Sequence, residues 1–278
     1  APQGIWAAGN TAMEHLLMGL DTASLGRYPF TPVSLEEMEL LPEPEYKGPR
    51  IGLLPGISAF VGADIAAGLL ACGFGERREE SCRLFIDLGT NGEMAAAGKG
   101  RLICTATAAG PAFEGGAAAN VPGTDMIALL AEMLETGIID ESGLLEDAYF
   151  EKGWQKGALR ITQQDIRALQ MAKAAVCAGV ELLMEALEIG ASDVEQVFLA
   201  GGFGYYLDVE KAARIGLFPA ELADKVTAVG NTSLLGTCLY GGDPSLREKT
   251  KDLCRRAEVM NLAEQPGFEE RYLGRLNF

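Results

Sequence analysis

The sequence has few positively charged residues for its length. Its 278 residues contain 23 Lys and Arg against 39 Asp and Glu, a formal net charge of −16. Nucleic-acid binding depends on Lys and Arg meeting phosphates, so this balance argues against a nucleic-acid partner and against an anionic membrane surface. No apolar run approaches the roughly 20 residues needed to span a bilayer. No charged segment followed by an apolar one opens the chain, so we expect a cytoplasmic protein.

Metal-ligand patterns are also scarce. The cysteines stand at 72, 82, 104, 177, 238 and 254, and no two of them form a Cys-x-x-Cys pair. This spacing argues against a zinc or iron–sulfur site within these residues and favours reduced, mostly buried thiols. His15 is the only histidine, and a lone histidine makes no metal site without partners. We expect it to be a packed, hydrogen-bonded helix residue.

Glycine, by contrast, is abundant at 35 residues, and many glycines gather around one apparent hairpin. A strand ending on Asp87 is followed by the turn Gly89-Thr90-Asn91-Gly92 and by strands over 93–97 and 101–107. Glycines let backbone N–H groups converge on an anion, and a neighbouring carboxylate suits Mg²⁺. The string therefore fits a phosphate-binding hairpin. It fits an ordinary tight hairpin, with Asp87 capping its turn, equally well.

Hydrophobic spacing predicts several helices. One runs from Thr11 to Gly19, with Leu16 and Leu17 facing inward, and a long one runs from Asp165 to about Glu188 after a capping box at 162–165. Lys173 interrupts the apolar stripe of the long helix. Its stem either lies along the core while the ammonium reaches elsewhere, or the ammonium meets a bound anion. Other helices are expected over 57–70, 125–136, 209–214, 233–240 and 245–264.

A second glycine turn follows the apolar strand 197–200. The string Gly201-Gly202-Phe203-Gly204 lets a flat ligand approach the backbone. Its spacing is not that of a Rossmann fingerprint.

Two parts of the chain repeat one order of elements. IWAAGN (5–10) resembles VFLAGG (197–202), and LLPGISAFVG (53–62) resembles TAVGNTSLLG (227–236), each as strand, glycine and helix. Such a repeat indicates a duplicated fold. The second copy is preceded by the hairpin at 84–107. We therefore expect a matching hairpin upstream of the first copy, and interpret the chain as a C-terminal piece of a longer protein.

Together these strings resemble the actin, sugar kinase and Hsp70 ATPase superfamily. They resemble most closely the C-terminal ATPase domain of reductive activators of corrinoid proteins. The matching strings are AGNTAMEHLLMG (8–19), FIDLGTNGEM (85–94), TAAGPAFEGG (107–116), QMAKAAVCAG (170–179), LAGGFGYYLD (199–208) and ARIGLFP (213–219).

The resemblance implies an α/β fold with duplicated ribonuclease H-like lobes, of which the first lobe is incomplete here. The implied division is the remainder of the first lobe with a connecting helix over 1–78, a second lobe over 79–245, and a tail over 246–278 that packs back on the lobes.

The resemblance also implies ATP and Mg²⁺ as ligands and a corrinoid protein as partner. ATP would help drive reduction of Co(II) to Co(I), with the electron coming from a two-iron two-sulfur domain placed N-terminal to these residues. A homodimer is the assembly considered. The alternatives are a small-molecule kinase of the same fold and a non-catalytic domain that docks a partner.

Site residues carry over position by position. Asp87 is implied to hold the metal, Glu114 to position water or metal, and Lys173 to approach the base or ribose, while Gly56 and Gly230 open the two connecting helices. The phosphate and adenosine turns comprise Asp87, Gly89, Thr90, Asn91, Gly92, Gly201, Gly202 and Phe203.

Two departures from the family pattern stand out. The family's first phosphate loop, a DIGTT-like turn, is absent. Relatives also carry a longer stretch after the GPAFEGG string, whereas here Gly116 is followed almost at once by Pro122-Gly123-Thr124-Asp125. These departures bear on whether this chain alone binds ATP and on the surroundings of Glu114.

Overall fold

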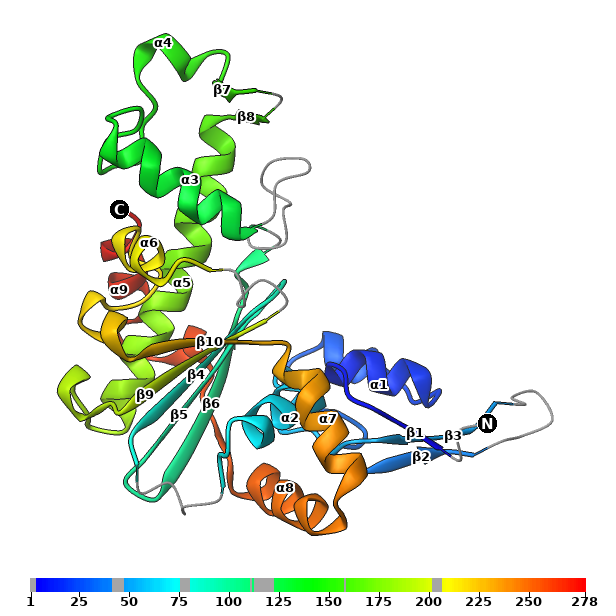
Figure 1. Ribbon diagram of the computed structural model, residues 1–278. Coiled ribbons are helices and arrows are strands. Elements are labelled where there is room, and N and C mark those ends of the chain that lie inside the picture. The colour runs from blue at the N-terminus through cyan, green and yellow to red at the C-terminus, as the bar shows by residue number, and fades with distance from the viewer. Residues whose placement is uncertain are drawn as a thin grey trace. The chain divides into compact units, whose positions relative to one another are not determined.

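The computed structural model describes residues 4–41, 48–75, 81–110, 112, 123–157, 159–201 and 207–278. The chain forms two compact units (Figure 1). Unit 1 contains residues 1–81, 97–104 and 231–259, and unit 2 contains 82–96, 105–230 and 260–278. These units are groupings by contact, and the lobe boundaries expected from the sequence stay a prediction.

Unit 1 is built on a three-stranded sheet in the order β1-β3-β2. Strands β1 (Gly4–Ala7) and β3 (Arg50–Leu53) are parallel, with Ile5 opposite Ile51, and β2 (Met38–Leu40) pairs antiparallel with β3. The parallel pair places the carboxyl ends of β1 and β3 at the same edge. The helices of unit 1 are α1 (Thr11–Leu17), α2 (Ala63–Ala71), α7 (Thr232–Gly242) and α8 (Pro244–Arg256), with a 3-10 turn at Ala23–Gly26.

Helices α2 and α7 pack against each other at small residues. A Cβ added to Gly236 would overlap the backbone carbonyl of Ala67, so only glycine permits this approach. The small residues Ala67 and Gly236 thus let the two helices approach closely. Leu54, Ala63, Ala67, Leu70 and Tyr240 form the buried core of this region.

Two expectations for unit 1 are wrong. Leu16 and Leu17 face solvent, with Leu16 69 % exposed, whereas Glu14 and His15 are buried. Helix α1 begins directly after its cap, Asn10, whose side chain accepts from Met13 N–H at 2.9 Å, and this start fixes the buried face. His15 is the packed residue expected, because its Nδ1 lies 2.7 Å from the Thr11 carbonyl and its Nε2 accepts from Val33 N–H.

Helix α2 begins at Ala63, not near 57 after Gly56 as expected. Residues 57–61 form a turn instead, because Ile57 N–H donates to the Val61 carbonyl and the Ser58 hydroxyl accepts from Val61 N–H, both at 3.0 Å. Gly56 donates its N–H to Leu35. It therefore does not open the helix.

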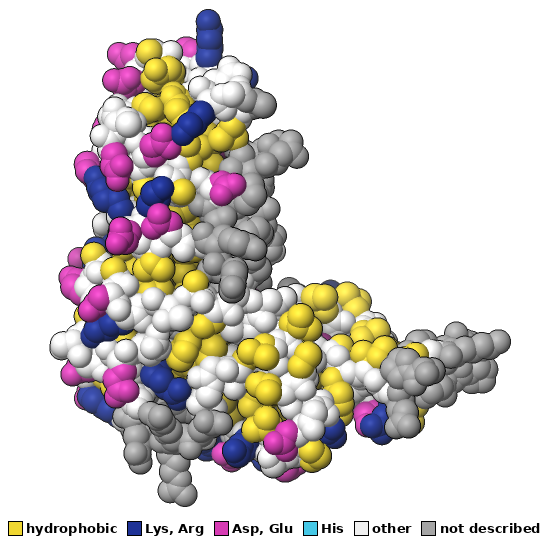
Figure 2. Space-filling view, viewed as in Figure 1, with side chains coloured by type: hydrophobic (Ala, Val, Ile, Leu, Met, Phe, Trp, Pro, Cys, Tyr) yellow, Lys and Arg dark blue, Asp and Glu magenta, His cyan; other side chains and the backbone are white. Residues whose placement is uncertain are grey.

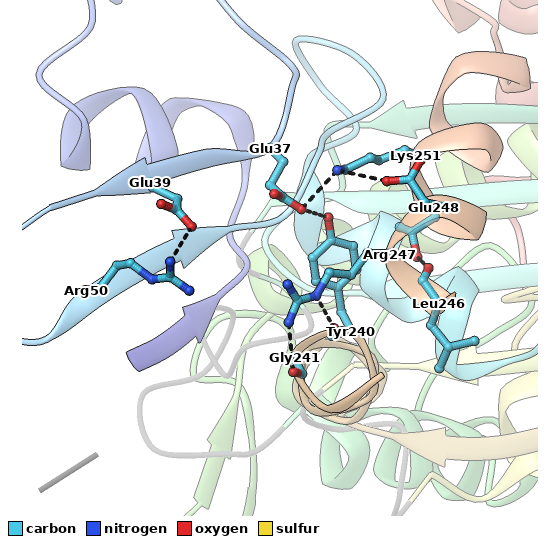
Figure 3. Close-up of polar contacts among 10 residues, drawn as sticks. Glu37, Glu39, Arg50, Tyr240, Gly241, Leu246, Arg247, Glu248 and Lys251 are labelled. Atoms are coloured by element: carbon cyan, nitrogen blue, oxygen red, sulfur yellow. Dashed lines mark hydrogen bonds and ion pairs between the residues drawn. The ribbon is translucent and has the colours of Figure 1, made fainter. Parts of the chain in front are cut away.

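A polar network joins the segment before β2 to helices α7 and α8 (Figure 3). The Tyr240 hydroxyl donates to Glu37, and Lys251 Nζ lies 3.4 Å from the same carboxylate. The Arg247 guanidinium lies 4.3 Å from the Trp6 ring centroid. Glu37 is therefore held by contacts from both α7 and α8.

A six-stranded sheet in the order β10-β9-β4-β5-β6-β11 forms the body of unit 2. The end of β5, the first part of β6 and all of β11 are grouped with unit 1. The strands of this sheet are β4 (Arg83–Leu88), β5 (Gly92–Gly98), β6 (Arg101–Thr107), β9 (Gln196–Ala200), β10 (Val226–Gly230) and β11 (Glu258–Val259). The predicted hairpin is confirmed as β4, β5 and β6. The helix predicted over 245–264 ends at Arg256, because β11 pairs parallel with β6 there.

Long helix α5 (Gln163–Ala186) packs on the sheet of unit 2 (Figure 1). Thr162 and Asp165 form the predicted capping box, and Gly179 lies against Met94 of β5. The predicted helix 209–214 is also confirmed, and the Asp208 side chain caps it. The remaining elements of unit 2 are α3 (Gly123–Glu135), α4 (Asp147–Phe150), β7 (Trp154–Lys156), β8 (Leu159–Ile161), α6 (Val209–Arg214), α9 (Phe268–Gly274) and 3-10 turns at Ala191–Asp193, Ala220–Lys225 and Leu262–Glu264.

Candidate functional site

Three turns of unit 2 meet at one edge of its sheet. Strands β4, β9 and β10 are parallel neighbours, so their carboxyl ends lie together. Asp87 is opposite Ala200, and Ala200 is opposite Gly230. In open α/β sheets, ligands bind outside the carboxyl ends of the strands. The structure thus brings Asp87, Gly201 and Gly230 to one place, although they are far apart in sequence.

Gly201 joins these turns directly. Its backbone has φ +112°, and its N–H donates to the Gly230 carbonyl at 3.1 Å. A Cβ at this position would overlap the carbonyl oxygen of Leu88, the residue just before the hairpin turn. Any side chain here would therefore separate the two bends.

The hairpin turn is closed by its own backbone. Gly89 N–H donates to the Asn91 carbonyl at 3.0 Å, and both Thr90 and Asn91 are exposed. Gly92 is buried, because a Cβ there would lie 3.0 Å from the Val176 side chain of α5. Asp87 is partly buried. The N–H groups of Gly89 and Gly201 are thus both paired within the protein, and the exposed Thr90 and Asn91 lie at the tip of the turn.

Lys173 of α5 is buried, with 1 % of its surface exposed. Its Nζ donates to the Asn277 carbonyl, lies 5.2 Å from the Phe278 ring centroid and would lie 3.2 Å from a Cβ at Gly216. Burial lowers the pKa of its ammonium to about 8. The first of the two interpretations is therefore the one observed, with the stem in the core and the ammonium on a backbone carbonyl. Contact with a base or ribose stays a prediction.

Three predicted site residues, Glu114, Gly202 and Phe203, lie outside the described residues.

Sequence reasoning missed two neighbouring carboxylates in unit 1, the buried Glu14 and the partly buried Asp64, near the carboxyl ends of β1 and β3. Burial raises the pKa of Glu14 to about 8, and burial raises that of Asp64 as well. The sequence spacing places Glu14 three residues after Thr11, on the same face of the helix, and Thr11 is buried. The prediction instead placed the hydrophobic Leu16 and Leu17 on the buried face.

Within the described ranges, no group of three or more His, Cys, Asp or Glu residues is arranged to hold a metal ion. The cysteines are free thiols. Burial raises the pKa of Cys177 and of Cys254 to about 12, so both are protonated at neutral pH. Among the same residues, no helix is both long and apolar enough to cross a membrane.

Comparison with known proteins places this geometry in a family. Residues 81–120 and 117–278 match the model of the C-terminal domain of RACo, the ASKHA domain, and residues 3–77 match the RACo middle region. The C-terminal match is in two pieces that meet at 117–120, next to the shortened stretch seen in the sequence. Such shortening would be expected to break the match there.

Two curated relatives are similar to this chain. The corrinoid activation enzyme RamQ of Eubacterium limosum is 31 % identical over 330 residues, which cover 95 % of this chain and 54 % of RamQ. The [Co(II) methylated amine-specific corrinoid protein] reductase of Methanosarcina barkeri is 28 % identical over 233 residues, covering 65 % of this chain and 42 % of that protein.

A solved structure of a reductive activator for corrinoid, iron-sulfur protein matches with a TM-score of 0.86 and 28 % identity, over 99 % of this chain and 52 % of that one. The chain thus spans about half the length of the relatives it matches most fully. The match confirms the α/β actin-like ATPase fold expected from the sequence. By its sequence and its fold, the chain belongs to the RACo family, with residues of the middle region followed by the C-terminal ASKHA domain.

Proposed function

We propose that this chain is the ATP-binding and ATP-hydrolysing part of a reductive activator that helps drive Co(II) to Co(I) in a corrinoid protein. The observation that carries the proposal is the meeting of the turns after β4, β9 and β10, with Gly201 bonded to Gly230 and pressed against Leu88. Family membership and the names of the relatives supply the reaction class.

The residues at this edge fit Mg²⁺ and a nucleotide. Exposed Thr90 and Asn91 would donate to phosphate oxygens, and Asp87 would hold the Mg²⁺ directly or through water. The bare backbone of Gly201 would let a flat base approach the sheet edge. Phosphoryl transfer needs mainly such positioning and charge stabilisation, and bound Mg²⁺–ATP supplies the energy of hydrolysis. Glu114 is proposed to position water or metal.

The electron for cobalt is proposed to come from an iron–sulfur domain outside these residues. The cysteines of the described part do not cluster, so they do not fit an iron–sulfur centre. An iron–sulfur domain elsewhere in the polypeptide, a corrinoid protein as partner, a homodimeric assembly and a cytoplasmic location remain proposals from the family resemblance. ATP hydrolysis would bias the closure of the lobes and thereby the cobalt coordination of the partner.

The test is ATP turnover by the full-length activator with its corrinoid protein, in the wild type and in Asp87→Asn. We expect turnover and ATP-dependent Co(I) formation to fall by about 10²-fold or more in Asp87→Asn, as for loss of a preorganised charge. Asp147→Asn, an exposed change on α4, is the matched control and should keep full activity. Both variants should keep the wild-type circular dichroism spectrum.

Unimpaired Co(I) formation in Asp87→Asn would overturn the assignment of the phosphate turn. Turnover that depends on an added small alcohol or acid, and not on the corrinoid protein, would favour a kinase instead. Binding of the corrinoid protein with no ATP turnover in the wild type would favour a docking domain.

A further inference from the structure

Two strands and two helices of unit 1 converge at a second sheet edge. The carboxyl ends of β1 and β3 lie there, as do the caps of α1 and α2, Asn10 and Gly62. The Gly9 carbonyl accepts the N–H of Ala63 at 3.0 Å and of Asp64 at 3.2 Å. The start of α2 is therefore fixed against the end of β1.

Glu14 lies at this junction, and among the described residues no positively charged side chain forms an ion pair with it. Its side chain is 6 % exposed, and Oε1 has no hydrogen-bond partner within the described part of the chain. The Gly9 backbone bonds to the carboxylate, and the nearby charge of Asp64 repels it. Burying a carboxylate oxygen without a hydrogen-bond partner costs free energy, and a bound ligand would remove that cost.

Asp64 is held close to this point by glycine. A Cβ on Gly62 would lie 2.6 Å from the Asn10 Cα and 2.8 Å from Asp64 Oδ1, so a larger residue would push the two segments apart. Asp64 Oδ1 also accepts from Ile65 N–H at 2.9 Å. None of the ion pairs among the described residues involves either carboxylate.

We propose that Glu14 and Asp64 form a site for a small hard divalent cation of the Mg²⁺ class, separate from the nucleotide site proposed in unit 2. Two carboxylates match a double positive charge, and Mg²⁺ is commonly held by one or two carboxylates with water completing its shell. The contrast with unit 2 supports a cation here, because the sheet edge of unit 2 carries glycine turns suited to an anion.

The test uses Mn²⁺ as a paramagnetic probe on the nucleotide-free 278-residue chain, with Mg²⁺ as competitor. We expect wild type to bind one Mn²⁺ that Mg²⁺ displaces. Glu14→Gln and Asp64→Asn should weaken binding by on the order of tenfold or more, since even outer-shell changes at metal sites have effects of that size. Asp147→Asn is the control and should bind as wild type does.

A second measurement keeps the result interpretable if a variant folds poorly. Mg²⁺ should raise the unfolding temperature of wild type and of Asp87→Asn but not that of folded Asp64→Asn, as expected for a ligand that binds only the native state. The proposal is wrong if wild type binds no cation. It is also wrong if Asp87→Asn removes the binding while Glu14→Gln retains it, because the cation then lies at the edge in unit 2. Neither result depends on ATP turnover, so the nucleotide proposal stands or falls separately.

Discussion

Glu14 shows how one buried side chain sets the response of the protein to pH. Burial raises its pKa to about 8, well above the ordinary value of 4.5 for a glutamate. Below pH 4.5 the group is protonated in both states, so its contribution to stability is complete. As pH rises, the unfolded chain releases the proton first, and that stability is lost up to about pH 8.

We therefore predict that, with divalent cations chelated, the free energy of unfolding of the wild type falls between pH 5 and 8. In Glu14→Gln the part of this fall that is due to Glu14 should be absent. Urea unfolding at several pH values measures the free energy of unfolding of both proteins. At pH 8 the Gln variant should be the more stable protein, since it carries no buried charge beside Asp64. An unchanged slope in Glu14→Gln would contradict the assigned ionisation.

Lys173 gives a second prediction at the scale of one residue. Lys173→Met keeps the apolar stem but leaves the Asn277 carbonyl without its donor, so we expect a loss of about 1–3 kcal/mol of stability. Urea unfolding measures this loss of stability, and titration of the same variant with ATP measures its ATP affinity. Unchanged stability with a large loss of ATP affinity would show that the ammonium serves the base or ribose instead.

At the scale of elements, the contact between α2 and α7 depends on Gly236. We predict that Gly236→Ala destabilises unit 1 by about 1–3 kcal/mol, because the new Cβ meets the rigid Ala67 carbonyl. Gly242→Ala, at the end of the same helix, is the matched control, since a Cβ there meets nothing within 4 Å. Equal stability of the two variants by thermal unfolding would show that the helices lie farther apart.

The sequence predicted those elements whose ends are marked by caps or turns of a few adjacent residues. Thr162 and Asp165 mark the start of α5, Asp208 marks α6, and the turn at 89–92 marks the hairpin, because caps and turns are properties of a few adjacent residues. It failed where distant contacts decide. Leu16 is exposed and His15 buried because Thr11 and His15 of α1 bond to Ser58 and Val33, which lie far from them in sequence.

Parts of the candidate site were predictable in the same sense. The glycine turns after β4 and β9 are visible in the sequence, whereas their meeting at one edge depends on the parallel pairing of Asp87 with Ala200. The fate of Lys173 was not predictable, because its partner, Asn277, lies 104 residues away in sequence.

At the scale of the whole molecule, unit 1 exposes a group of apolar side chains. Figure 2 shows hydrophobic side chains on the surface over α7, and Leu234, Leu235 and Leu239 are the large exposed ones of that helix. Unit 2 contains all the described residues of the proposed nucleotide site. Nucleotide contacts at the phosphate and adenosine turns can therefore be tested within a single unit.

Hydrogen exchange on this chain with and without a non-hydrolysable Mg²⁺–ATP analogue tests the central claim most directly. We predict that the analogue slows exchange together in the peptides covering 87–92, 198–201 and 228–231, because one ligand contacts all three turns. Peptides covering α4 should be unaffected. Protection at only one of these turns, or at none of them while the analogue binds elsewhere, would contradict the shared nucleotide site.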